Sequence, residues 1–369
     1  MKKIAIVGGG ISGIVLSSLL KKFLNYDIQI FERYELSESV NGIQISPNGN
    51  KILDMLDFSE MQNQYVQINK INFFDLKNKS YISSMKLDYD TNDKYITLNR
   101  TELLKFLIHK YSLNENINNK TVTEVSEKNS SVILSDKSEI YFDYIIIADG
   151  IFSKLRPNFI KAIYSRFTAY RGTYETNIQR HDVDVHMGED FHLVSYPINE
   201  KKMNSFTLVN KETNEKIINN YNFEASTFKD DFISKIPPSH NDVFKSNNVK
   251  LWPIYKLNKI YFGNKNIFYI GDSAHGFIPS RAQGASQAIE DAYAIYKLLN
   301  KNNLTHEKFI KLRKTKIKKI IKKSENNLFI FHQSFFLIRL FRNLFIKIIC
   351  SSKGLTKKFN SYIFDFKLN

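Results

Sequence analysis

The pattern with the clearest chemical meaning lies near the start of the chain, where Gly8, Gly10 and Gly13 follow the spacing G-x-G-x-x-G. In such a turn the first glycine allows the bend, the second lets a pyrophosphate approach the backbone, and the third lets a helix pack on a strand. Glu32 lies 19 residues beyond Gly13, where a carboxylate accepts hydrogen bonds from a ribose. The pattern predicts a dinucleotide site, without separating NAD from FAD.

Two later segments favour FAD over NAD. Gly271-Asp272 follows an apolar run, and a carboxylate at a strand end is suited to accept hydrogen bonds from the ribityl hydroxyls of a flavin. Gly284 and Ala285 begin a segment with helical spacing. Free N–H groups at that helix start would face the flavin pyrimidine carbonyl and stabilise negative charge on a reduced flavin. A plain NAD dehydrogenase would have no use for Gly271-Asp272.

These residues require a frame of buried strands and helices. Short apolar runs predict strands at 2–7, 27–32, 144–148 and 267–270, and helical spacing predicts helices over 14–24, 98–111 and 285–299. Shorter strands are expected at 122–126, 131–134 and 139–142. Between 164 and 257 the pattern changes, and segments 168–174, 191–197 and 204–210 are typical of one antiparallel sheet. Basic, apolar, helical sequence follows from residue 307.

The order of these elements predicts an α/β fold. A Rossmann-like FAD-binding domain is interrupted by a mostly antiparallel β-sheet substrate domain, and C-terminal helices follow. We expect the FAD-binding domain to comprise residues 1–68, 98–163 and 258–302. The substrate-binding domain would comprise 69–97 and 164–257, and the C-terminal helical segment 303–369.

Composition narrows the class of protein. The chain of 369 residues carries a formal charge of +16, with 43% hydrophobic and 24% charged residues. No nucleic-acid motif accompanies the charge, so we expect no nucleic-acid partner. The single cysteine, Cys350, rules out an internal disulfide framework, and we expect no metal site. With neither a signal peptide nor a transmembrane run apparent, we expect a cytoplasmic protein.

Together the motifs resemble the single-component FAD-dependent aromatic hydroxylases, the group related to para-hydroxybenzoate hydroxylase. The resemblance is carried by Gly8 to Gly13 with Glu32-Arg33, by Asp149-Gly150 with Arg156, and by Gly271-Asp272 with Pro279. Three shorter segments, 42–48, 169–172 and 192–197, are most similar to the salicylate and 3-hydroxybenzoate hydroxylase branch. The resemblance covers roughly residues 1–299.

The resemblance implies which residues bind the cofactor. The expected FAD-binding residues are Gly8, Gly10, Gly13, Glu32, Arg33, Arg100, Asp149, Asp272, Pro279, Gly284 and Ala285. Arg100 would lie along FAD, and Asp149 would organise its turn, with Arg156, in a segment linked to both FAD and NAD(P)H. His275 would either lie near the isoalloxazine with Pro279 or serve as a hydrogen-bonding residue at a helix entry.

The resemblance also implies the reaction. Members of the group have no separate NAD(P)H domain, and this sequence has no second G-x-G-x-x-G. NAD(P)H would act as a transient co-substrate that reduces the flavin. O2 would then form a flavin hydroperoxide that hydroxylates a small phenolic or carboxylated aromatic substrate, while the protein orients the ring and excludes water.

A histidine and a tyrosine are the candidate catalytic residues. On the strand expected at 191–197, His192, Val194 and Tyr196 share one face. A phenol must lose its proton before such an attack, and histidine, with an ordinary pKa of about 6.5, suits that task. The resemblance places His192 at a substrate histidine of the branch. We expect His192 as the base with Tyr196 beside it, against the alternative of a structural histidine.

Gln44 and Arg281 are the candidate substrate residues. Ser280-Arg281 departs from the family, whose members carry an aromatic and an apolar residue there. Arg281 would contact a substrate carboxylate through a charge-assisted pair, or else point to solvent.

Two alternatives remain open. One is a hydroxylase of quinone biosynthesis that acts on a lipid-tailed ring, in which case residues 329–349 would touch a membrane surface, a peripheral contact. We favour instead a C-terminal helix that packs on the FAD-binding domain. The other is a non-hydroxylating FAD dehydrogenase or a protein that keeps FAD as a structural relic.

Overall fold

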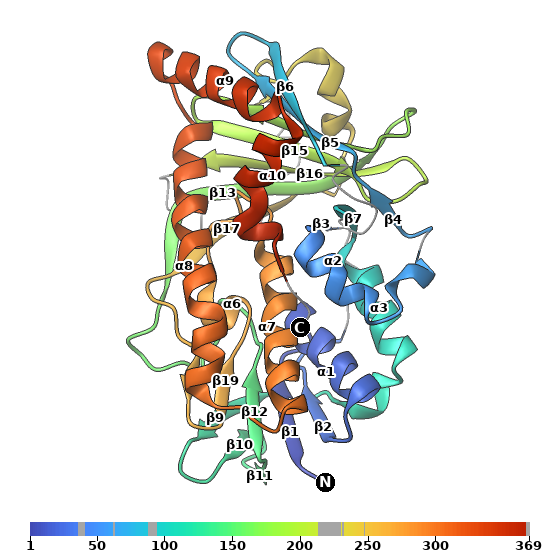
Figure 1. The fold of residues 1–369 in the computed structure, drawn as a ribbon, viewed down its shortest axis with the longest axis vertical. Coiled ribbons are helices and arrows are strands. Elements are labelled where there is room, and N and C mark those ends of the chain that lie inside the picture. Colours follow the sequence, from blue (N-terminus) through green and yellow to red (C-terminus); the bar gives the residue numbers. More distant parts are fainter. Residues whose placement is uncertain are drawn as a thin grey trace.

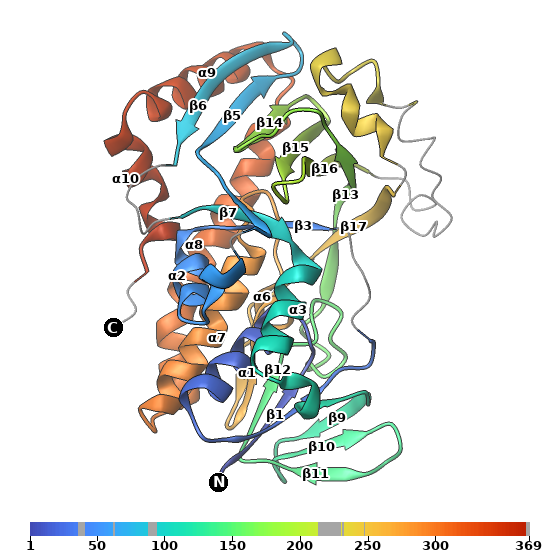
Figure 2. The same cartoon turned by 90° about the vertical axis from the view of Figure 1, so that its right-hand side faces the viewer.

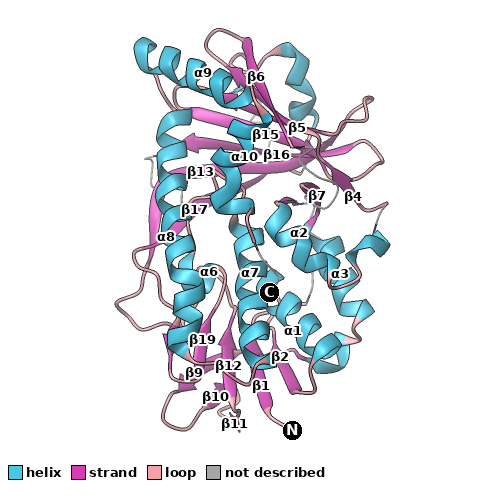
Figure 3. Ribbon diagram, in the orientation of Figure 1, coloured by secondary structure: helices cyan, strands magenta, loops and turns pink. Residues whose placement is uncertain are grey.

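The computed structural model describes residues 1–35, 41–61, 63–87, 94–212, 230, 232–246 and 248–366. The molecule is elongated, with a sheet near the N-terminus at one end and a larger sheet at the other (Figures 1 and 2). Helices run alongside and between the two sheets (Figure 3).

The first sheet carries the glycine turn. Its six strands lie in the order β18-β19-β12-β1-β2-β8, and all neighbours are parallel except β18 and β19. They are β1 (Lys3–Val7), β2 (Asp27–Phe31), β8 (Ile117–Asn118), β12 (Tyr144–Ile147), β18 (Gly263–Asn264) and β19 (Ile267–Tyr269). The central strands are continuous apolar runs, as expected for strands covered on both faces.

Two helices and a small sheet accompany this core. Helix α1 (Ile11–Phe23) packs against α7 (Gly284–Asn300), and α3 (Arg100–Lys110) packs on α1. A three-stranded antiparallel sheet is formed by β9 (Val122–Ser126), β10 (Ser131–Leu134) and β11 (Glu139–Tyr141). All of these elements fall where the apolar patterning predicted them.

The larger sheet has seven strands in the order β17-β13-β16-β15-β14-β5-β6. They are β5 (Lys70–Asp75), β6 (Ser80–Lys86), β13 (Ala162–Glu175), β14 (Asp182–Met187), β15 (Phe191–Pro197), β16 (Met203–Lys211) and β17 (Lys250–Leu257). The predicted antiparallel grouping of 168–174, 191–197 and 204–210 is confirmed, because β13, β16 and β15 are neighbours. Within this sheet, β5 and β14 are the only described neighbours that pair in parallel.

The remaining elements join the two sheets. A small sheet consists of β3 (Gly42–Ile45), β7 (Ile96–Asn99) and β4 (Tyr65–Gln67). The short helices are α2 (Pro47–Asp54), η1 (Phe58–Met61), η2 (Leu113–Asn116), η3 (Pro238–Lys245) and α6 (Asp272–His275). The fold class expected from the sequence is confirmed: an α/β nucleotide-binding core, an inserted mostly antiparallel sheet, and C-terminal helices.

The C-terminal helices divide between the two sheets. They are α8 (His306–Phe331), α9 (Phe336–Cys350) and α10 (Lys353–Phe364). Helix α8 packs on α7. Residues 329–349, which we expected to pack on the FAD-binding domain, instead supply most of α9, which packs on β6 of the larger sheet. Among the described residues, no helix is both long and apolar enough to cross a membrane.

Candidate functional site

The glycine turn has the close contacts that its motif predicts. Gly8 has a φ of +112°, and a Cβ there would lie 2.4 Å from the Ala148 carbonyl oxygen. A Cβ on Gly13 would lie 2.0 Å from the Gly8 carbonyl oxygen, so only glycine lets α1 approach the turn this closely. At Gly10, by contrast, the nearest atom to a Cβ is an Arg100 nitrogen at 3.9 Å. Open space therefore adjoins the N-terminus of α1.

Glu32 lies beside this turn, at the end of β2. Its carboxylate accepts hydrogen bonds from the backbone N–H of Gly9 at 2.6 Å and of Tyr34 at 3.0 Å. Arg33 packs its guanidinium on the Tyr34 ring, 4.8 Å from the centroid. The backbone contacts fix the carboxylate next to the glycine turn, where the motif requires it.

Arg100 and Asp272 face each other across the same region. Burial lowers the pKa of Arg100, while the carboxylates of Glu32 and Asp272 raise it. The Asp272 side chain reaches the surface. The protein around it nevertheless raises its pKa, although electrostatic interactions with His275, Arg171 and Arg100 lower it. The predicted residues Glu32, Arg100 and Asp272 interact with one another beside the open space at Gly10, which we call the recess.

Asp149 and Arg156 belong to an adjoining turn. Burial raises the pKa of Asp149 to about 6, although a hydrogen bond from Ser153 and the Arg156 charge lower it. Its Oδ1 is buried and has no hydrogen-bond partner among the described residues. Arg156 donates to the carbonyl oxygens of Ser273 at 3.0 Å and of Ile151. Arg156 therefore ties this turn to the Gly271-Asp272 turn.

A buried ionic network holds the Gly271-Asp272 turn in place. Asp291 on α7 accepts from the Gly271 N–H at 2.8 Å and lies 2.6 Å from His275 Nε2. Arg313 on α8 donates to Asp291 at 2.6 Å and pairs with Glu290. Burial alone would raise the pKa of Asp291, but His275 and Arg313 bring it down to about 2. His275 therefore acts at the helix entry as a hydrogen-bonding residue.

The start of α7, where Gly284 and Ala285 lie, is open. A Cβ on Gly284 would have no heavy atom within 4 Å. Pro279 precedes it in a turn closed by the Ala282 N–H, which donates to the Pro279 carbonyl oxygen at 3.0 Å. The free N–H groups of this helix start are available to an electronegative group.

The two faces of the larger sheet differ in chemistry. One face is apolar and packs against Phe232 and Ile236; its strand residues include Tyr170, Tyr174, Phe191, Leu193, Phe206 and Leu208. The strand register places a different set on the opposite face: Ala169, Arg171, Thr173, Ser205, Thr207, Val209, His192, Val194 and Tyr196. The predicted alternation in 191–197 therefore holds, and the polar face is joined to β3 through a hydrogen bond from Gly42 to Ser205.

Tyr196, Gln44 and Arg171 meet on this polar face. Burial raises the pKa of Tyr196, while the Arg171 charge and hydrogen bonds with Ser205 and Gln44 lower it. The Tyr196 hydroxyl donates to the Gly42 carbonyl oxygen at 2.9 Å. Burial lowers the pKa of Arg171, while Tyr196 and Asp272 raise it. Arg171 thus connects the polar face of the sheet with the recess at Asp272.

Arg171 was missed as a candidate residue in the sequence, although segment 169–172 was recognised as similar to the hydroxylase branch. Its Nε is buried without a hydrogen-bond partner among the described residues. A buried guanidinium nitrogen without a partner is costly unless a further group satisfies it. Only the strand register, which places it on the same face as Tyr196, reveals its position.

His192 lies on the same face but farther along the strand. Four residues of extended chain separate it from Tyr196, about 13 Å. Its Nδ1 is 2.7 Å from Nε2 of His332, just after α8, and its ring packs edge-on against Phe331. Burial, with His332 beside it, holds the pKa of His192 well below its usual range. The structure therefore places His192 with α8, apart from Tyr196 and Gln44.

Arg281 contacts the C-terminal helices and does not point to solvent. Its guanidinium packs over the rings of Phe359 and Tyr362 at 5.2 and 5.7 Å and donates to Asn327 at 2.9 Å. Burial lowers its pKa. These contacts tie the turn after Pro279 to α8 and α10.

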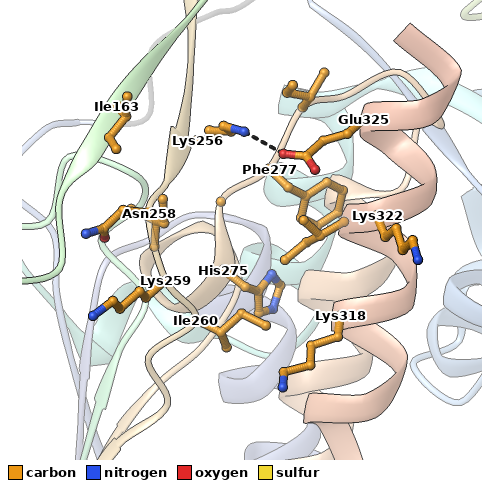
Figure 4. A pocket seen from close by; sticks show the side chains of 14 residues that line it. Ile163, Lys256, Asn258, Lys259, Ile260, His275, Phe277, Lys318, Lys322 and Glu325 are labelled. Atoms are coloured by element: carbon orange, nitrogen blue, oxygen red, sulfur yellow. Dashed lines mark hydrogen bonds and ion pairs between the residues drawn. The ribbon is translucent and has the colours of Figure 1, made fainter. Parts of the chain in front are cut away.

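A cavity of about 440 Å³ lies between α8 and the segment around Asn258, with His275 and Phe277 at its centre (Figure 4). Lys256 and Glu325 form an ion pair at 2.5 Å across it. Its lining includes neither Arg171, Tyr196 nor Asp272. The cavity is therefore a separate feature from the recess at Asp272.

Comparison with known proteins identifies the family. Residues 1–303 match the family described as an FAD binding domain. The chain belongs to this FAD-binding family. It is similar to 3-hydroxybenzoate 6-hydroxylase 1 of Aquipseudomonas alcaligenes, with 27% identity across 79% of each chain. It is also similar to salicylate hydroxylase of Pseudomonas putida, with 25% identity across 80% of this chain and 77% of the relative.

The fold agrees with a solved flavoprotein. Klebsiella pneumoniae HpxO complexed with FAD and uric acid has a TM-score of 0.83 to this chain, with 16% identity and coverage of 98% and 97%. The protein is thus an FAD-dependent monooxygenase of the salicylate and 3-hydroxybenzoate hydroxylase type, as the motifs indicated. The open space at Gly10, the fixed Glu32 carboxylate and the crowded Asp272 recess fit FAD.

Proposed function

We propose that this FAD-dependent monooxygenase uses NAD(P)H and O2 to hydroxylate a small phenolic or carboxylated aromatic ring. In the balanced reaction, one oxygen atom enters the ring and the other leaves as water, while NAD(P)H is oxidised. The observation that carries the proposal is that Arg171, on the same face of the sheet as Tyr196, interacts electrostatically with both Tyr196 and Asp272. It offers a cation at the junction of the cofactor recess and the polar face of the sheet.

The cofactor would be held by the residues that gather around the glycine turn. Gly10 leaves room for the pyrophosphate, Glu32 would bind the adenosine ribose, and Arg100 and Asp272 would line the recess between them. When bound, FAD supplies electron transfer and the activation of oxygen. The division into domains at 1–68, 98–163 and 258–302, with 69–97 and 164–257 inserted, belongs to the same proposal.

The substrate would lie on the polar face of the larger sheet. The two relatives named above act on 3-hydroxybenzoate and salicylate, which are phenols with a carboxylate. Arg171 would bind the carboxylate through a charge-assisted pair, and Gln44 with Tyr196 would orient the ring. His192 is the proposed base, acting from the side of Arg171 opposite Tyr196, because the strand register places Arg171 level with Val194, midway between them. Its lowered pKa keeps the imidazole neutral at neutral pH and able to accept a proton, at the cost of weaker basicity.

Replacement of Arg171 tests where the substrate binds. Arg171→Gln should raise the KM for a carboxylated substrate by about tenfold or more, the scale of a lost charge-assisted hydrogen bond, while FAD content stays unchanged. Arg166→Gln, on an exposed arginine of the same strand, is the matched control. If both variants retain the wild-type KM, the substrate does not lie on this face.

A lipid-tailed ring is the second candidate substrate, because α9 exposes a broad apolar surface. The reaction would be the same, but the enzyme would also have to accommodate the lipid tail of the substrate. Activity that depends on the tail length of a phenolic substrate would favour it.

A further inference from the structure

Helix α9 turns both of its arginines inward. Arg339 and Arg342 are each 5% exposed and pair with Asp75 of β5 at 3.1 and 2.8 Å. Large apolar side chains point outward instead, each 42–67% exposed: Phe335, Phe336, Leu337, Ile338, Leu340, Phe341, Leu344, Phe345 and Ile348. The helix lies at the end of the molecule remote from the N-terminus (Figures 1 and 2).

This arrangement is the reverse of an ordinary surface helix. Such a helix buries its apolar stripe and turns its charges to water. Here the arginines anchor α9 to the sheet, and the apolar residues form a contiguous outer face. Contiguous exposed apolar surface on a folded protein marks a site for another protein or for a membrane.

The charge of the C-terminal segment favours an anionic lipid surface as the partner. No aspartate or glutamate occurs from Asn326 to Phe364, whereas the whole chain has 37 acidic residues. Lys347, Lys353, Lys357 and Lys358 are exposed on α9 and the helix that follows it. An apolar face with flanking lysines and no acidic residue is complementary to a bilayer that contains anionic lipids.

We propose that α9 is an interfacial helix that docks the enzyme on an anionic lipid bilayer. Its outer face would enter the headgroup and acyl boundary while the lysines contact lipid phosphates. Its 15 residues are too few to span a bilayer, so the helix lies in the plane of the surface. Since His332 precedes α9 by only four residues, the docked surface adjoins the segment that contacts His192.

A second copy of the chain fits this face less well. A two-fold contact places the same patch of each copy against the other. The lysines of residues 347–358 would then oppose identical lysines with no acidic residue in the segment to offset them. A bilayer with anionic headgroups brings the opposite charge.

The test is co-sedimentation of the full-length flavoprotein with vesicles of phosphatidylcholine alone and of phosphatidylcholine with phosphatidylglycerol. Wild type should sediment with the anionic vesicles and much less with the neutral ones. The double variant Phe336→Ser with Phe341→Ser should weaken binding by about tenfold or more, because two aromatic side chains that would enter the bilayer are lost. Phe159→Ser with Ile178→Ser, at side chains 61% and 69% exposed elsewhere, should bind like wild type.

Three outcomes would overturn the proposal. The first is that wild type does not bind vesicles, and the second is that both double variants bind equally well. The third is that wild type forms a dimer without lipid and that the double variant in α9 is a monomer. Light scattering after gel filtration detects the last. FAD absorbance and turnover with a water-soluble substrate are measured on the same samples, so loss of docking is distinguishable from loss of the proposed reaction.

Discussion

His192 on β15 lies 2.7 Å, Nδ1 to Nε2, from His332 at the end of α8. This contact is the direct link between the predicted base and the C-terminal helices. Burial lowers the pKa of both imidazoles, that of His332 to about 4, so the pair is neutral at neutral pH. Protonating either ring would place a charge in a buried site.

Stability should therefore fall as the solution is acidified. The folded pKa of His332 lies below the unfolded value of about 6.5, so the unfolded chain binds more protons across that interval. The free energy of unfolding should decrease between about pH 6.5 and pH 4. Urea titrations across this range measure it, with His332→Gln expected to show a shallower dependence. Identical pH dependence in both proteins would contradict the prediction.

Loss of the His192 imidazole should impair the chemical step. We expect His192→Ala to reduce hydroxylation at saturating substrate by about 10²-fold, the usual scale for general base catalysis. The flavin spectrum should not change, because His192 lies away from the glycine turn. Turnover and product yield per NAD(P)H equal to wild type would show that His192 serves only to hold α8.

Small changes at the glycine turn should affect FAD retention before they affect folding. A Cβ on Gly10 meets no atom nearer than 3.9 Å, so Gly10→Ala should fold but occupy space needed by the pyrophosphate. Flavin content of the purified protein should drop sharply, and likewise in Asp272→Ala. Gly354→Ala, with nothing nearer than 3.5 Å, is the control. Full FAD occupancy in both Gly10→Ala and Asp272→Ala would contradict the assignment of Gly10 and Asp272 as FAD-binding residues.

The buried network at Asp291 should contribute strongly to stability. Asp291→Ala removes one of the two carboxylate partners of Arg313 and leaves the Gly271 N–H without its acceptor, and breaking a buried ion pair costs about 3–5 kcal/mol. Urea denaturation gives the value. Asp136→Ala removes an ion pair with both side chains 51% exposed and should have far less effect. Equal midpoints for the two variants would mean that the network does not stabilise the turn.

The sequence predicted the elements whose patterns are local. The glycine turn, Glu32 and the strand before Gly271 were recognisable because spacing and apolar runs determine them. The alternation in 191–197 predicted the shared face of His192 and Tyr196. Strands β5 and β6 were not predicted as strands, since their membership in the larger sheet depends on pairing with β14, far along the chain.

The parts of the site that depend on distant contacts could not be predicted. Nothing local in the sequence indicates that His192 meets His332, which is 140 residues away. Arg281 was expected to contact a substrate carboxylate or to point to solvent, but its partners belong to α8 and α10. Arg339 and Arg342 likewise point inward because both pair with Asp75, far away in the sequence. This orientation leaves the apolar side of α9 exposed.

The central claim is tested most directly by following oxygen into product. The purified flavoprotein is incubated with NAD(P)H and a panel of phenolic and carboxylated aromatics under isotopically labelled O2, and products are identified by mass. We predict that one compound accelerates NAD(P)H oxidation and gains a single labelled oxygen atom on its ring. Oxidation of NAD(P)H that no aromatic accelerates, with no labelled product, would contradict the assignment as an aromatic hydroxylase.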